Sequence, residues 1–366
     1  MNLRQHGDKV LAEVLAQALG QSGTVERGTH GFHAYPASIH PDAVALFLEL
    51  APGHVHDPFC GGGTVLVEAL GHGRSCSGTD VSPVALLVAG ARTASAELAT
   101  PMRSAARRLA ARGREPGPAH VPEALRKWYQ PHVGQELARI LEGIREEEEP
   151  VRSLLMAIFS SILVKVSYRS SETSRKLVKH HRPPGTTSVL FHKKARELGR
   201  MLESLAAAER PELLHADASC RESLVPAGLI VTSPPYPGVY DYLPMQELRL
   251  RWMELDAGEG FGREVGSRRS FRADRREAVG NWRRTTVDWI GRQARGLAPG
   301  GRMVMVVGDG LVGGKTVDAL EPSVEGIERA GLELEARATA DRRDHARSQV
   351  RGEHALLAVK PPRPTR

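Results

Sequence analysis

Cysteine and long apolar runs are what this sequence of 366 residues has least of. Its three cysteines, Cys60, Cys76 and Cys220, are too few for a disulfide framework and lack the CxxC spacing typical of a zinc site. The first twenty residues mix charged with apolar side chains, which is unlike a signal peptide or a membrane anchor. We therefore expect a protein of the reducing cytoplasm that has no contact with a membrane.

Acidic side chains are the minority among the charged residues. The chain has 50 Lys and Arg against 43 Asp and Glu, a formal charge of +7 and a pI near 9.5. Because each phosphate that Lys or Arg neutralises releases condensed counterions, this excess favours a polyanionic partner. Hydrophobic residues make up 41% and charged residues 25%, which is typical of a globular protein and excludes the disordered and membrane classes.

Short apolar segments alternate with helical patterns along most of the chain. Because helices separate the predicted strands, we expect an α/β fold with a doubly wound, mostly parallel sheet. A stretch rich in Ala, Arg, Glu and Leu at helical spacing predicts a helical insertion. The strands are predicted at 55–59, 75–80, 213–217, 228–232, 302–307 and 354–359. The predicted organisation is an N-terminal helix (1–27), one half of the sheet (28–100), the helical insertion (101–205), the other half of the sheet (206–362) and a tail (363–366).

A glycine-rich segment, DPFCGGGT at 57–64, lies between a predicted strand and a predicted helix. Glycines let the backbone turn sharply there and approach a ligand closely, although a plain turn is the alternative. The segment has neither the GK[ST] ending of a triphosphate loop nor the GxGxxG spacing of a dinucleotide loop, so S-adenosylmethionine, which has no phosphate, remains compatible. Asp80, at the end of the second strand, can accept hydrogen bonds from ribose hydroxyls. Asp217, at the end of the third predicted strand, can face the adenine amino group or can simply end that strand.

A second segment, TSPPYPGVYDY at 232–242, follows the apolar strand GLIV. Methylation of an aromatic amine needs acceptor groups that orient the amine, because its lone pair is delocalised into the ring. The Ser233 hydroxyl and the Pro234 carbonyl are suitable acceptors, and the prolines make the backbone rigid. Tyr236 offers a flat face for stacking on a base, which contributes about 1–3 kcal/mol. The alternative is a proline-rich turn with buried tyrosines.

With these two segments the chain resembles the amino-methylating DNA methyltransferases. DPFCGGGT is similar to the cofactor motif of that family, and TSPPY is similar to its catalytic motif, whose serine form is typical of N4-cytosine enzymes. HAYPASIHPDAV at 33–44 and LAPGGRMVMVVGD at 297–309 extend the resemblance, which covers roughly 28–95 and 210–362. It implies a Rossmann-like methyltransferase sheet, S-adenosylmethionine as cofactor, no metal, and direct methyl transfer to an exocyclic amino nitrogen, N4 of cytosine in DNA being favoured.

The resemblance also assigns residues. Tyr35 and Pro36 would lie near the methionine end of the cofactor, and Asp80 would lie on its ribose. The implied cofactor-binding set is Tyr35, Pro36, Asp57, Pro58, Phe59, Cys60, Gly61, Gly62, Gly63, Thr64, Asp80 and Asp217. The implied catalytic set is Ser233, Pro234, Pro235 and Tyr236.

The order of the two motifs leaves alternatives open. Many N4-cytosine enzymes have the catalytic motif first, whereas RNA amino-methyltransferases share the order found here, so an RNA base is an alternative substrate, as is adenine. Methylation of a cytosine ring carbon needs a cysteine nucleophile, usually after a proline, and none of the cysteines follows one. A catalytically silent nucleic-acid-binding protein is disfavoured by the intact motifs. The DNA interpretation allows a restriction endonuclease as partner.

Two basic stretches are candidates for contact with phosphates. Residues 165–200 hold ten Lys or Arg against Glu172 and Glu197, and residues 262–284 form a second basic stretch after the catalytic motif. The alternative for both is a solvated, charge-rich surface. The predicted nucleic-acid-binding residues are Arg169, Arg175, Lys176, Lys179, Arg182, Arg268 and Arg269.

Overall fold

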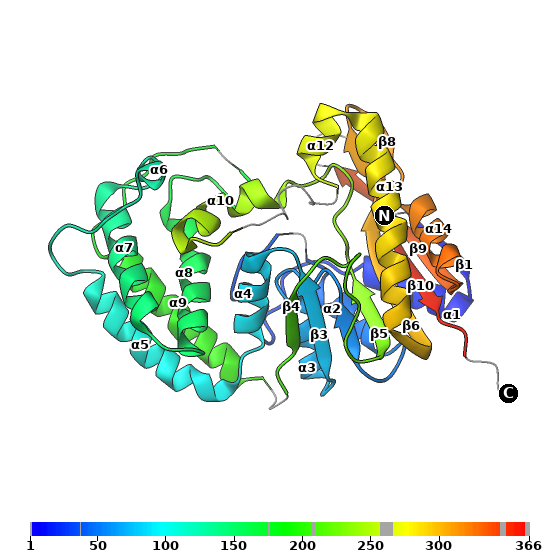
Figure 1. The fold of residues 1–366 in the computed structure, drawn as a ribbon, viewed down its shortest axis with the longest axis horizontal. Coiled ribbons are helices and arrows are strands. Elements are labelled where there is room, and N and C mark those ends of the chain that lie inside the picture. Colours follow the sequence, from blue (N-terminus) through cyan, green and yellow to red (C-terminus); the bar gives the residue numbers. More distant parts are fainter. Residues whose placement is uncertain are drawn as a thin grey trace.

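The computed structural model describes residues 2–36, 38–174, 176–205, 209–256, 266–344 and 349–362. Within these residues the main sheet has eight strands in the order β1-β9-β10-β6-β5-β2-β3-β4 (Figure 1). Its strands are β1 (Leu3–Gly7), β2 (Val55–Asp57), β3 (Cys76–Asp80), β4 (Glu212–His215), β5 (Ala227–Thr232), β6 (Leu297–Gly308), β9 (Glu333–Asp344) and β10 (Gln349–Val359). A separate antiparallel pair joins β7 (Gly310–Val312) to β8 (Lys315–Val317).

The predicted α/β fold with a mostly parallel, doubly wound sheet is confirmed. Strands β4, β3, β2, β5 and β6 pair in parallel. Strand β10 is antiparallel to both β6 and β9, so β9 runs in the same direction as β6. Apart from β10 and the edge strand β1, this order is the Rossmann order, in which the chain winds outward in opposite directions from β2 and β5. The switch point therefore lies between β2 and β5.

Helices cover both faces of the sheet. They are α1 (Lys9–Leu19), α2 (Pro41–Leu48), α3 (Thr64–Gly71), α4 (Pro83–Arg92), α5 (Ala99–Arg112), α6 (Glu123–Arg126), α7 (Pro131–Glu146), α8 (Val151–Val166), α9 (Thr186–Glu203), α10 (Tyr242–Met253), α12 (Arg268–Ala273), α13 (Arg275–Gly296) and α14 (Leu320–Arg329), with a short 3₁₀ helix at Ala96–Leu98. Alternate residues of β5 enter different cores: Leu229 and Val231 pack with α1, α2 and α3, and Ile230 packs with α13 and α14. Burial on both faces explains why this strand reads as a continuous apolar run.

The predicted helical insertion forms a bundle beside the β4 edge of the sheet (Figure 1). Its core combines α5, α7, α8 and α9 with α4 and α10, and α8 is buried nearly all round, with Phe159 and Ile162 fully enclosed. Figure 1 shows α10 between this bundle and α12, so α10 joins the insertion to the rest of the molecule. Among the described residues, no helix combines the length and the apolar character that a membrane span requires.

The structure differs from the predicted elements in three places. The segment 1–27 does not start as a helix: β1 precedes α1 and pairs with β9, with Leu3 opposite Ala340. Strand β1 is exposed at every residue, so it has no apolar alternation that would have predicted it. Strand β9 was also missed, because only the small side chains Ala336, Ala338 and Ala340 alternate inward between polar ones. The third predicted strand ends at His215, before Asp217.

Candidate active site at the sheet switch point

The two sequence motifs start from neighbouring strand ends. Strand β2 ends at Asp57, the first residue of the glycine-rich segment, and β5 ends at Thr232, directly before Ser233. The two strands pair in parallel, so both loops leave the same edge of the sheet. The Thr232 hydroxyl donates a hydrogen bond of 2.7 Å to Asp57 Oδ1 and ties the two loops together. In open α/β sheets ligands bind in the crevice at such a switch point.

The glycine loop is held in a narrow space. Gly61 (φ 49°) and Gly63 (φ 81°) have the left-handed backbone that favours glycine, and Gly63 directly precedes α3. A Cβ on Gly62 would lie 2.9 Å from Tyr35 Cβ and 3.0 Å from Arg92 Nη1. The loop thus fits only without side chains, between Tyr35 on one side and α4 on the other.

Two acids lie at the strand ends beneath this loop. Burial raises the pKa of Asp57 to about 7, although the hydrogen bonds from the Thr232 hydroxyl and the Phe59 N–H oppose the rise. The Gly61 N–H donates to Asp80 Oδ2 (2.9 Å) and the Ser82 N–H to Asp80 Oδ1 (2.8 Å). Each carboxylate oxygen can accept more than one hydrogen bond, so Asp80 can still accept hydroxyl groups.

Two cavities meet at Ser233. The smaller one is lined by Tyr35, Ser38, Ile39, Asp57, Phe59, Cys60, Gly61, Gly62, Thr64, Val65 and Ser233. A larger cleft of about 280 Å³ is lined by Ser233, Pro234, Tyr236, Tyr240, Tyr242, Glu353 and Arg351, among others. Because Ser233, Ser38 and Ile39 line both, a ligand in the smaller cavity and one in the larger cleft would touch at this serine. The glycine loop and the Ser-Pro-Pro-Tyr segment therefore open onto a common space.

Some predicted site residues stand apart from the cavities. Pro36, Pro58, Gly63 and Asp80 are not among the lining residues of the smaller cavity, although Pro58 and Gly63 belong to its loop. Asp217 is also absent from that lining, and its Oδ1 accepts hydrogen bonds from the Ser219 N–H (2.8 Å) and hydroxyl (2.6 Å). Asp217 thus holds the turn that follows β4, and its contact with the adenine amino group stays a prediction.

Cys60, which lines the smaller cavity, is not available as a nucleophile. Its side chain is buried against Gly78, where a Cβ would lie 2.8 Å from that of Cys60. Burial raises the pKa of the Cys60 thiol well above its usual value, and the charges of Asp80 and Asp57 add to the rise. The thiolate, which is the reactive form, is therefore suppressed.

The predicted nucleic-acid-binding residues fall into different environments. Lys176 and Lys179 are exposed, Arg182 is half-buried with its guanidinium on the Lys165 carbonyl, and Arg175 lies outside the described residues. Arg268 donates to the Val239 carbonyl, and Arg269 lies 3.5 Å from Asp241, so both also tie α12 to the chain after the catalytic motif.

Arg169 corrects the prediction of a phosphate contact. The residue is only 5% exposed, and its guanidinium donates to the carbonyls of Ser174, Met245 and Glu172. It therefore anchors the segment 169–174 to α10 instead of facing solvent. A single basic residue inside a basic stretch gives no sequence signal for such burial.

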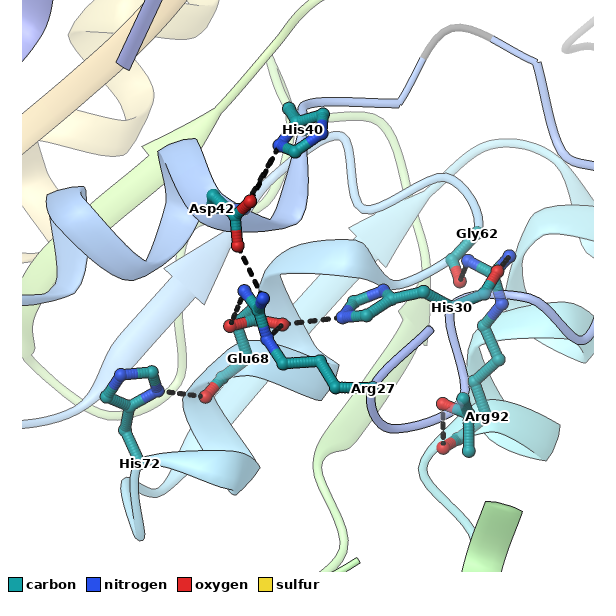
Figure 2. Close-up of polar contacts among 9 residues, drawn as sticks. Arg27, His30, His40, Asp42, Gly62, Glu68, His72 and Arg92 are labelled. Carbon is teal, nitrogen blue, oxygen red and sulfur yellow. Dashed lines mark hydrogen bonds and ion pairs between the residues drawn. The ribbon is translucent and has the colours of Figure 1, made fainter. Parts of the chain in front are cut away.

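Sequence reasoning missed the buried Arg92 at the end of α4. Its guanidinium donates to the carbonyls of Gly62 (2.8 Å) and His30 (2.9 Å) (Figure 2). It also donates to the His33 carbonyl (2.7 Å), and so connects the glycine loop with the segment before Tyr35. Burial lowers the pKa of Arg92 to about 10, so the group stays charged at neutral pH. The sequence signal that could have predicted this buried arginine is its position as the one charged residue in the apolar helix PVALLVAGAR.

A second missed cluster holds the same segment on α3. Glu68 of α3 is 4% exposed and accepts hydrogen bonds from Arg27 (3.0 and 3.1 Å) and contacts His30 Nε2 at 2.6 Å (Figure 2). Burial raises the pKa of Glu68, but these hydrogen bonds outweigh it and the net shift is downward. Arg27 also pairs with Asp42 of α2. The chain before Tyr35 is thereby fixed at both ends.

Comparison with known proteins gives a local likeness. No protein-family model matches the chain. Over 71 residues it is 39% identical to the Type II methyltransferase M.MvaI of Kocuria varians. The matched segment spans 18% of this chain and 16% of that protein. This match confirms, for that segment, the predicted resemblance to methyltransferases.

Two solved structures are similar at low sequence identity. TrmN from Thermus thermophilus is 14% identical with a TM-score of 0.34, covering 89% of this chain and 50% of that chain. The rRNA methyltransferase aviRa from Streptomyces viridochromogenes is 14% identical with a TM-score of 0.35, covering 90% of this chain and 88% of that chain. Both TM-scores are low, and the fold assignment rests on the strand order.

Proposed function

We propose that this protein is an S-adenosylmethionine-dependent methyltransferase that acts on an exocyclic amino nitrogen of a nucleic-acid base, with N4 of cytosine in DNA as the target. The observation that carries the proposal is the position of Ser233, which lines both the cavity of the glycine loop and the larger cleft. A donor in the first and a base in the second would meet there. The local likeness to a Type II methyltransferase supports methyl transfer. With DNA as substrate, a restriction endonuclease would be the partner.

The residues around the smaller cavity, which measures about 30 Å³, have the chemistry that S-adenosylmethionine binding requires. Gly61 and Gly62 present backbone to the cavity, and Phe59, which also lines it, packs edge-on against Trp289 (5.2 Å between ring centroids). Asp80 remains able to accept hydrogen bonds from ribose hydroxyls. The positive sulfonium of the bound cofactor would favour the carboxylate form of Asp57, and that negative charge would complement the sulfonium. When bound, the cofactor supplies an electrophilic methyl group.

The chain's own residues would position the acceptor. The Ser233 hydroxyl and the Pro234 carbonyl accept hydrogen bonds from the amine and hold its nitrogen toward the glycine loop. Holding two reactants in this geometry can lower the barrier by about 7–11 kcal/mol, so orientation supplies most of the rate. Because the same acceptors stabilise the amine as it becomes positive, they act more strongly in the transition state than before it.

Exposed basic side chains would hold the substrate strand. Lys176 and Lys179 lie on a segment that Arg169 anchors to α10, and α10 follows the catalytic motif. An RNA base is the second candidate, since the cofactor motif precedes the catalytic motif as in RNA amino-methyltransferases. The experiment below distinguishes the two.

Methyl transfer can be measured directly with tritiated S-adenosylmethionine and separate pools of DNA and RNA. We expect label in DNA, and digestion to nucleosides should give N4-methylcytosine. Label in RNA alone would replace the DNA assignment by the RNA alternative. Label in neither pool, with the folded protein, would overturn the proposed function.

The variant Ser233→Ala tests the role of the hydroxyl. We expect kcat to fall about 100-fold, as for removal of one positioned hydrogen-bonding group, while the Kd for S-adenosylmethionine stays unchanged. Ser219→Ala is a matched control, because its hydroxyl bonds to Asp217 away from the cavities. A parallel loss of cofactor affinity in S233A would contradict a role in positioning the amine.

A further inference from the structure

A row of hydrogen bonds leads from Ser233 along the wall of the larger cleft. The Ser233 hydroxyl donates to the Tyr236 hydroxyl (3.5 Å), and the Tyr236 hydroxyl donates to Glu353 Oε1 (3.1 Å). The row ends at Arg342, whose Nε donates to Glu353 Oε2 at 2.7 Å. All four residues line the cleft. No sequence motif connects Glu353 to the catalytic segment, which lies 117 residues earlier.

The sheet fixes Glu353 at this place. Glu353 of β10 is directly opposite Gly308 of β6, and residues opposite each other point to the same face. The Tyr236 ring rests on Gly308, where a Cβ would lie 2.4 Å from a ring carbon. Asp309 holds the two strands together here, since its N–H donates to the Gly352 carbonyl (2.8 Å) and its Oδ2 accepts from the Gly352 N–H (3.1 Å). The hydroxyl of Tyr236 therefore reaches Glu353 from a fixed ring position.

The chemistry of the two end groups sets the direction of the row. A guanidinium can only donate and a carboxylate can only accept hydrogen bonds, whereas a hydroxyl can do either. Paired with Arg342, Glu353 accepts, so the Tyr236 proton points to it. The Tyr236 oxygen then accepts the Ser233 proton. The remaining lone pairs of Ser233 face the cleft as acceptors.

We propose that Glu353 is a positioning residue that, through Tyr236, keeps Ser233 a hydrogen-bond acceptor and makes the cleft select a base edge with an amino group over one with a carbonyl. This inference rests on the proposed function, because the amino group it selects is the methyl acceptor. An amino group donates to Ser233, whereas a carbonyl at the same position would bring two acceptors together. Cytosine and adenine are thereby favoured over uracil and hypoxanthine.

The variant Glu353→Gln should reverse the direction of donation along these hydrogen bonds, because Gln has nearly the same shape as Glu. Its amide nitrogen can donate to the Tyr236 oxygen, so that the Tyr236 proton turns to Ser233 and the Ser233 proton turns to the cleft. We expect kcat to fall about tenfold or more, with the Kd for S-adenosylmethionine unchanged. Glu335→Gln is the matched control: it also breaks an Arg–Glu pair of the same sheet (with Arg302, 2.8 Å), but neither residue lines the cleft.

The preference of the cleft for an amino group over a carbonyl group is the second measurement. It would not change if Glu353 only stabilised the fold. A synthetic duplex carrying the mapped methylation site is compared, by fluorescence anisotropy, with the same duplex in which a carbonyl oxygen replaces the target amino group. The wild-type protein and E335Q should bind the amino duplex more tightly, and E353Q should lose or invert this preference. Glu353→Asp keeps a carboxylate, so the preference should survive in E353D even where the rate falls.

The outcomes separate the two proposals. If the wild-type protein transfers no methyl group, the proposed function fails and this inference fails with it. If the wild-type protein is active and E353Q, folded by circular dichroism, keeps both kcat and the amino preference, only the role of Glu353 is overturned. If E353Q does not fold, E353D and Tyr236→Phe test the proposal instead. E353D must keep the preference for the amino duplex. Y236F must weaken this preference, because it frees the Ser233 proton.

Discussion

At the residue scale, the site depends on polar side chains that hold backbone rather than touch a ligand. Arg92 donates to three carbonyls, one of them in the glycine loop, and lies only 3% exposed. A buried carbonyl that loses its donor costs about 1–3 kcal/mol. Loss of this guanidinium should therefore affect both the fold and the shape of the cofactor cavity.

The substitution Arg92→Met is expected to weaken S-adenosylmethionine binding about tenfold or more and to lower the free energy of unfolding by about 1–3 kcal/mol. Titration calorimetry and denaturant unfolding measure the two effects. Arg74→Met is the control, since Arg74 also donates only to backbone carbonyls, those of Gly53 and Leu48, away from the cavities. If both variants lose stability but neither loses cofactor affinity, Arg92 does not shape the cavity.

The raised pKa of Asp57 predicts that the free energy of unfolding depends on pH. Its pKa is raised from 3.8 to about 7 by burial, so between these values the folded state holds a proton that the unfolded state has lost. The stability that this proton contributes is fully present below about pH 4 and is lost as the pH rises through 7. From pH 5 to pH 8 the wild-type protein should lose on the order of 2 kcal/mol relative to Asp57→Asn. Urea unfolding at both pH values measures the difference, and a constant difference would contradict the buried, protonated carboxyl.

At the element scale, the pairing of β6 with β10 places the wall of the cleft. Gly308 and Glu353 are opposite each other, and the ring of Tyr236 fills the space above Gly308. Arg169 shows a similar dependence, since it donates one hydrogen bond to the Met245 carbonyl of α10 and two to the carbonyls of Glu172 and Ser174. In both cases one residue on an element sets the position of a segment far from it in the sequence.

The substitution Gly308→Ala should displace Tyr236 and lower methyl transfer about tenfold or more, because a shift of about 1 Å at a reacting group can cost 100-fold. Its Cβ would come within 2.4 Å of the ring, and the backbone of Gly308 is one that alanine can adopt, so the cause is contact alone. Gly71→Ala, where a Cβ meets nothing within 4 Å, is the control. Steady-state kinetics with tritiated cofactor check both, and full activity of G308A would show that the position of Tyr236 is not critical.

At the scale of the whole molecule, the excess of positive charge acts on the partner rather than on the fold. A formal charge of +7 favours a polyanion, and counterion release makes such binding depend steeply on salt. Many arginines, however, are used inside the structure, as Arg92, Arg169 and Arg249 show by their burial. Net charge therefore overstates the number of groups that can contact phosphates.

The double substitution of Lys176 and Lys179 by Ala should reduce the slope of log K against log salt for DNA binding by about 2, since each phosphate contact contributes about 0.9. Fluorescence anisotropy over a range of salt concentrations measures the slope. Lys9→Ala, at an exposed position on α1, should leave it unchanged. An equal change in K9A would mean that the segment 168–178 makes no specific contact.

The sequence by itself determined the fold class and where the two motifs lie. Apolar strands, glycine turns and helical periodicity are local signals, and parallel strands place their carboxyl ends at one edge, so Asp57 and Ser233 were predictable neighbours. Only the tertiary structure decided that Arg169 is buried, that β1 and β9 extend the sheet and that Glu353 meets Tyr236. Those outcomes depend on strand register and on packing between segments far apart in the chain, and neither leaves a periodic trace in the residues around it.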